Sequence, residues 1–134
     1  MGWDVLILNA DGVPKSLSGL PKDWAPKSMG DAAEVRAAIA TSAPDVDWTD
    51  PAWGVFAGDE FSVEFNLAAT GPVDSFALHI RGGGDPLRLI ADLCRPNGWA
   101  AVDFSTGDLI DLTNPSPESW LAWQHYRDKI LGKG

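Results

Sequence analysis

The sequence predicts an α+β fold, in which about three helices pack on a mainly antiparallel sheet of about five to six strands. Strand-like and helix-like apolar patterns alternate along the chain, and two of the strand-like segments have one apolar and one polar face. That order is typical of helices laid on one side of a sheet. The 134 residues suffice for one hydrophobic core, so we expect a single domain over residues 1–134.

The chain begins with a predicted strand at residues 3–9, followed after a long loop by the first helix. The strand has the sequence WDVLILN, an apolar run typical of a strand buried on both faces. The helix is expected over residues 28–44. Ser28 and Asp31 form a capping-box-like start there, and Pro44 stops the helix.

Three further strands are predicted at residues 53–56, 61–67 and 75–81. The second has the sequence FSVEFNL and the third SFALHIR, and both alternate apolar with polar residues. Short turns join the three segments. We therefore expect an antiparallel meander with one face exposed to water.

Three glycines, residues 82–84, precede a predicted helix of about ten residues that starts at Asp85 and Pro86. A phosphate-binding loop would need a following Lys and Ser or Thr, which this segment lacks. The Asp85 carboxylate would also cap the amide groups that a phosphate would use. We interpret the glycines as a sharp corner and Cys94, on the apolar helix face, as an inert core thiol.

The C-terminal part predicts a hairpin and a last helix. Residues 99–104 and 108–112 form the hairpin, with Gly107 in the turn position that requires positive φ. The helix is expected over residues 116–131, which open with Ser116 and Pro117.

The charge of the chain excludes some partners. A formal net charge of −9 and a pI of about 4.4 argue against binding nucleic acid or an anionic membrane, and permit basic proteins or cations. The single cysteine favours a reducing compartment. We find no signal peptide or membrane-spanning run in the sequence, and we expect a cytoplasmic protein.

No recognised motif for catalysis, metal binding or cofactor binding is present in the sequence. The two histidines lack metal-ligand spacing, and no nucleophile elbow occurs. We therefore expect no enzyme activity, no cofactor and no metal. An alternative is an enzyme or small-molecule binder with a cleft lined by His79, Arg81, Asp103 and Asp108.

The segment 45–64 combines six acidic residues, no basic residue and two tryptophans. Acidic side chains around an aromatic anchor suit the capture of a basic protein. A solvated loop beside two core tryptophans would give the same pattern. The predicted partner-binding residues are Asp45, Asp47, Trp48, Asp50, Asp59, Glu60 and Glu64.

Three stretches, MGWDVLILN, DPAWGVFAGDEFSVEFNL and LHIRGGGDPLRLIADLCRPNGWAAVDFSTGDLIDL, resemble small bacterial proteins that are mostly uncharacterised. In size, charge and architecture the chain is also similar to immunity-protein families of bacterial toxin systems. This resemblance implies a small acidic cytosolic domain without catalytic residues, which neutralises a cognate basic toxin by contact. A phage- or secretion-associated adaptor remains an alternative, and the sequence does not indicate an oligomeric state.

Overall fold

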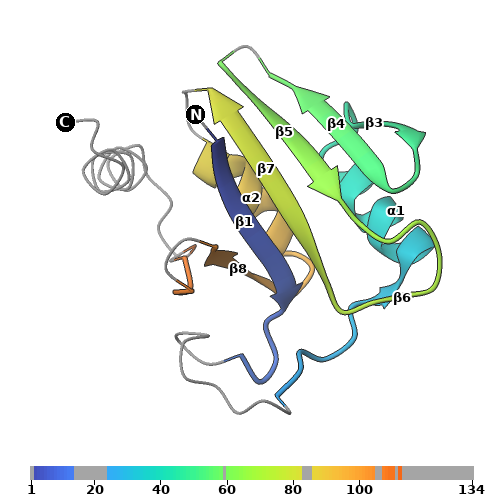
Figure 1. The fold of residues 1–134 in the computed structure, drawn as a ribbon, viewed down its shortest axis with the longest axis vertical. Helices are drawn as coiled ribbons and strands as arrows, with labels where there is room; N and C mark the ends of the chain where they lie inside the picture. Colours follow the sequence, from blue (N-terminus) through green and yellow to red (C-terminus); the bar gives the residue numbers. More distant parts are fainter. Residues whose placement is uncertain are drawn as a thin grey trace.

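The computed structural model describes residues 2–13, 24–58, 60–82, 86–104, 107–110 and 112. Its main element is a six-stranded sheet in the order β3-β4-β5-β7-β1-β8, in which all neighbouring strands are antiparallel (Figure 1). The strands are β1 (Gly2–Asn9), β3 (Asp47–Asp50), β4 (Trp53–Ala57), β5 (Phe61–Asn66), β7 (Ser75–Gly82) and β8 (Trp99–Asp103). A separate two-stranded sheet pairs β2 (Gly30–Asp31) with β6 (Pro72–Val73).

The predicted α+β class and the antiparallel sheet are confirmed, but the number of helices differs. The described residues contain two helices, α1 (Ala32–Ser42) and α2 (Pro86–Cys94), rather than about three. The helix expected over residues 116–131 lies outside the described residues. The short edge strand β3 was not expected, because its sequence DWTD has no apolar alternation.

Both helices pack on the same face of the sheet, and the core lies between the two layers (Figure 1). Val63 and Phe65 of β5, with Leu78 and Ile80 of β7, point into this core, as the alternating pattern predicted. The helices contribute the apolar side chains of Val35, Ile39, Leu87, Ile90, Leu93 and Cys94.

The first helix starts later than the sequence pattern indicated. Asp31 is the N-cap, and its carboxylate accepts a hydrogen bond from the Ala33 amide at 3.3 Å. Ser28 instead accepts a bond from the Gly30 amide at 3.2 Å. Gly30 has a φ of 115° and lies in β2, so the chain turns there before it enters the helix.

Strand β1 was expected to be buried on both faces, and the structure confirms this only in part. Trp3, Val5 and Ile7 are buried on the helix side. On the other side, which no described helix covers, Asp4 is exposed and Leu6 is half-buried, whereas Leu8 is buried.

One side of the sheet is covered by neither of the described helices, and we call it the open face. Antiparallel partners project to the same side, so the register defines which residues belong to it. The open face carries the side chains of Asp4, Leu6, Trp53, Val55, Ser62, Glu64, Asn66, Ala77, His79 and Arg81.

Candidate functional site

Three of the acidic residues predicted to bind a partner lie on or just before β3, the edge strand of the sheet, and a fourth lies at the adjoining end of the sheet. Asp47 and Asp50 lie on β3, and Asp45 lies in the segment just before it. Glu60 follows β4, at the end of the sheet where β3 begins. All four are exposed, and we call them the acidic edge. Asp59 lies outside the described residues.

Asp47 is held by Thr49 of the same strand. Its Oδ1 accepts hydrogen bonds from the Thr49 backbone amide at 2.8 Å and from the Thr49 hydroxyl at 2.6 Å. These two bonds stabilise the charged carboxylate, the hydroxyl bond most, and hold the pKa of Asp47 below its usual value. The register between β3 and β4 is irregular between Asp47 and Asp50, and a charged, irregular edge resists pairing with another strand.

The turn between β3 and β4 is fixed from both sides. The Asp50 carboxylate accepts a bond from the Ala52 amide at 2.9 Å. The Arg36 guanidinium, on α1, donates to the carbonyl oxygens of Pro51 at 3.2 Å and Ala69 at 3.0 Å. The end of the acidic edge is therefore tied to the helix layer.

Trp48 faces the core side of β3 rather than the side of its acidic neighbours. Its ring covers Gly54, where a Cβ would come within 2.8 Å of the ring carbons. The ring also lies 6.0 Å from the ring of Phe65, centroid to centroid. Trp48 is half-buried, so most of its contact surface already serves the packing of the sheet edge.

Glu64 lies away from the acidic edge, in a row of side chains that crosses the open face. The register pairs Asp47 with Val55, Val55 with Glu64, Glu64 with His79 and His79 with Asp4. Partners opposite each other in antiparallel strands have their Cβ atoms about 5 Å apart. The row therefore joins the acidic edge to the centre of the sheet.

His79 is the centre of an ordered cluster on the open face. Its Nδ1 lies 2.8 Å from Asp4 Oδ1, and the two side chains are 29% and 55% exposed. The Trp53 ring stacks on the His79 ring, with centroids 5.7 Å apart and planes inclined by 26°. The imidazole is thus fixed by a hydrogen bond at its edge and by a ring on its face.

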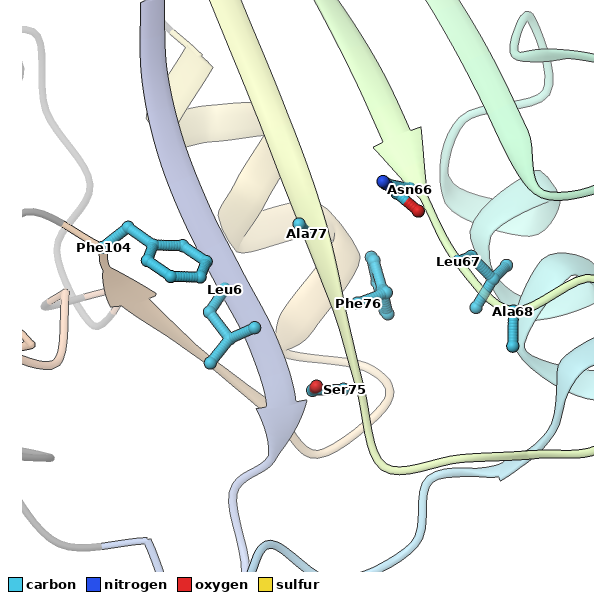
Figure 2. A pocket seen from close by; sticks show the side chains of 8 residues that line it. All are labelled: Leu6, Asn66, Leu67, Ala68, Ser75, Phe76, Ala77 and Phe104. Carbon is cyan, nitrogen blue, oxygen red and sulfur yellow. The ribbon is translucent and has the colours of Figure 1, made fainter. Parts of the chain in front are cut away.

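A shallow groove of about 320 Å³ adjoins this cluster on the open face (Figure 2). Leu6, Ala77, Ser75 and Asn66 line it, and the Phe104 ring lies beside Leu6. Phe104 is 58% exposed, and its backbone amide donates to the Asp4 carbonyl at 3.1 Å. The groove therefore gives the cluster an apolar and aromatic border.

The four residues of the alternative cleft do not lie together. His79 and Arg81 project from β7 to the open face, whereas Asp103 pairs with Val5 and projects to the opposite side. Asp103 is 4% exposed. Asp108 is exposed beyond β8, where its carbonyl accepts a bond from the Asp103 amide at 2.9 Å.

Two residues of the open-face cluster were missed by the sequence reasoning. Asp4 stands within an apolar run, and Trp53 stands at the start of a predicted strand of the meander, but the sequence did not indicate which residue of the other strands it would face. Only the register of β4, β5, β7 and β1 brings them to His79. The one signal in the sequence was the alternation that turned Glu64 and His79 outward.

Comparison with known protein-family profiles, with curated proteins and with solved structures finds no match to this chain. Within the described residues, no helix is long and apolar enough to cross a membrane. The same part of the chain contains no group of three or more His, Cys, Asp or Glu side chains placed to hold a metal ion.

Proposed function

We propose that this chain is a non-enzymatic binding protein that recognises a basic protein through the acidic edge and its continuation at Glu64. The observation that best supports this proposal is that four carboxylates are exposed on the edge strand β3 and at the adjoining end of the sheet: Asp45, Asp47, Asp50 and Glu60. The contact surface of the proposal also includes Trp48 and Asp59, which complete the set named from the sequence.

The electrostatics of the acidic edge support this class of partner. Residues 45–64 contain no Lys or Arg, so no basic side chain within the segment neutralises the carboxylates. The lowered pKa of Asp47 keeps that group charged well below neutral pH. A clustered charge of one sign steers an oppositely charged partner and raises the rate of association.

Within this class we propose an immunity protein of a bacterial toxin system, acting in the cytoplasm on a cognate toxin. The net charge of −9 suits a toxin whose active site is basic, because the acidic edge would cover that site and neutralise it. The small size and α+β fold agree with the resemblance drawn from the sequence. This function needs no catalytic residue and no cofactor.

Growth rescue tests this function. The products of the genes beside this one are expressed singly in a sensitive host, with and without this chain. We expect one product to stop growth and wild-type protein to restore it. The triple variant Asp47→Lys, Asp50→Lys, Glu60→Lys should fail to restore growth, whereas Asp92→Lys, an exposed acid on α2, should succeed. Absence of rescue by wild-type protein contradicts the immunity function.

A further inference from the structure

We infer that the centre of the open face binds an arginine side chain of the protein partner. This inference rests on the proposed function and names the group that the partner inserts. The site, which we call the Trp53–His79 patch, consists of Asp4, Trp53, Glu64 and His79.

The Trp53–His79 patch offers an ordered aromatic surface. Trp53 comes from β4 and reaches across β5 to stack on His79 of β7, at a centroid distance of 5.7 Å. The bond of 2.8 Å to Asp4 fixes the imidazole from the other side. A partner group therefore meets rings that are already in place, which lowers the entropy cost of binding.

The carboxylate beside these rings has no ion-pair partner in the part of the chain that the structure describes. Glu64 is directly opposite His79 in the register and is half-buried. Among the described residues it forms no salt bridge, and Arg81, two residues from His79 on the same strand, does not approach it within 4 Å. Glu64 is thus available to accept hydrogen bonds from a cation above the patch.

The chemistry of the patch favours arginine over lysine. A guanidinium is planar, stacks on an aromatic ring and donates two parallel hydrogen bonds to one carboxylate. An ammonium group is compact and strongly hydrated, and it gains less from a ring and a single carboxylate. Trp53 and Glu64 supply the ring and the carboxylate, and both adjoin His79.

The charge of the open face distinguishes a basic partner from a second copy of this chain. Asp4, Glu64 and Asp47 stand in one row of the open face. The next row contains Arg81, which is the one Lys or Arg among the described strand residues of this face. A second copy carries the same negative row and the same net charge of −9, so the two faces repel each other. A basic segment instead complements the row.

Nuclear magnetic resonance tests the inference with a defined probe. The peptide acetyl-Gly-Arg-Gly-amide is titrated into the ¹⁵N-labelled full chain, and acetyl-Gly-Lys-Gly-amide serves as the comparison. We expect the indole signal of Trp53, assigned by its loss in Trp53→Phe, to shift together with the amide signals of Glu64 and His79. The indole signals of the buried Trp3 and Trp99 should stay in place.

Removing the charge of Glu64 tests whether its carboxylate accepts the hydrogen bonds of the arginine. Glu64→Gln keeps the shape of the side chain and should weaken binding of the arginine peptide about tenfold, because a charge-assisted bond is lost. Glu34→Gln removes the same charge from an exposed position on α1, which packs on the opposite side of the sheet, and should leave the affinity nearly unchanged. The retained spectrum of the remaining residues shows that each variant is folded.

Several outcomes overturn the inference: no response to the arginine peptide, equal responses to both peptides, or an affinity that Glu64→Gln does not change. Signals of the patch that move with protein concentration alone would assign the open face to a second copy and would also overturn it. Peptide binding without growth rescue would support the arginine site and contradict the immunity function. Growth rescue without peptide binding would support the immunity function and contradict the arginine site.

Discussion

Asp4 and His79 lie opposite each other on β1 and β7, and Asp4 Oδ1 is 2.8 Å from His79 Nδ1. The two residues are 75 positions apart in the sequence, so folding alone brings this pair together. The pair fixes the ring on which Trp53 stacks. It therefore couples the position of a half-buried aromatic side chain to a hydrogen bond at the centre of the sheet.

The substitution Asp4→Asn tests this coupling. We expect the free energy of unfolding to fall by less than about 1 kcal/mol, because the pair is partly exposed, while the indole signal of Trp53 changes position. Asp11→Asn is the control, since Asp11 forms an exposed ion pair with Lys27 at 2.7 Å and has no contact with Trp53. A Trp53 signal unchanged in Asp4→Asn would contradict the coupling.

The contact between Trp48 and Gly54 predicts a stability defect at the acidic edge. A Cβ at position 54 would lie 2.8 Å from the Trp48 ring, so Gly54→Ala should destabilise the protein by about 1–3 kcal/mol through overpacking. Urea unfolding measures the change. In the double variant Trp48→Leu, Gly54→Ala the cost of the alanine should largely disappear. Additive effects of the two substitutions would show that the contact is not what constrains Gly54.

The hydrogen bonds from Thr49 predict a lowered pKa for the Asp47 carboxyl group. Because both bonds favour the charged carboxylate, the pKa of Asp47 should lie below 3.8, and Thr49→Val should raise it by removing the hydroxyl bond. The stabilising effect of this group is present above its unfolded pKa and is lost as the pH falls through its lowered folded pKa. Carbon-detected NMR titration of the carboxyl group measures both values. A pKa at or above the ordinary value would contradict the assigned bonds.

The burial of Cys94 predicts that the stability of the fold depends on pH in the alkaline range. Burial raises the pKa of its thiol from 9.0 to about 12, since the thiolate cannot be solvated in the core. Above pH 9 the unfolded chain loses this proton while the folded chain keeps it. Stability should therefore fall by about 1.4 kcal/mol per pH unit until the folded pKa is reached. We measure the free energy of unfolding in urea between pH 8 and 10.5. It should fall less steeply with pH for Cys94→Ala than for wild-type protein, and equal dependence on pH in the two proteins would contradict the account.

The alternating strands could be predicted from the sequence, because a residue's side of the sheet depends only on parity. Val63, Phe65, Leu78 and Ile80 are buried as the pattern predicted. Strand β3 could not be predicted, since its four residues are mostly polar and its place depends on pairing with β4. The start of α1 was misjudged for a related reason, because residues 30–31 are drawn into pairing with β6.

The candidate site was predicted only in part. The acidic composition of residues 45–64 is a property of the sequence, and so is the outward position of Glu64. The position of β1 beside β7 and the register of the strands are not, and the register determines that Trp53 reaches His79 across the predicted meander. A local pattern cannot indicate contacts between residues so far apart in the chain.

The most direct test of the central claim is the association rate with the toxin found by growth rescue, measured by stopped-flow fluorescence over a range of salt concentrations. The account predicts a fast rate for wild-type protein that falls steeply with salt. For the variant Asp47→Lys, Asp50→Lys, Glu60→Lys it predicts a rate about tenfold lower or more at low salt, with a weaker salt dependence. Equal rates and equal salt dependence for the two proteins would contradict the claim that the acidic edge meets the partner.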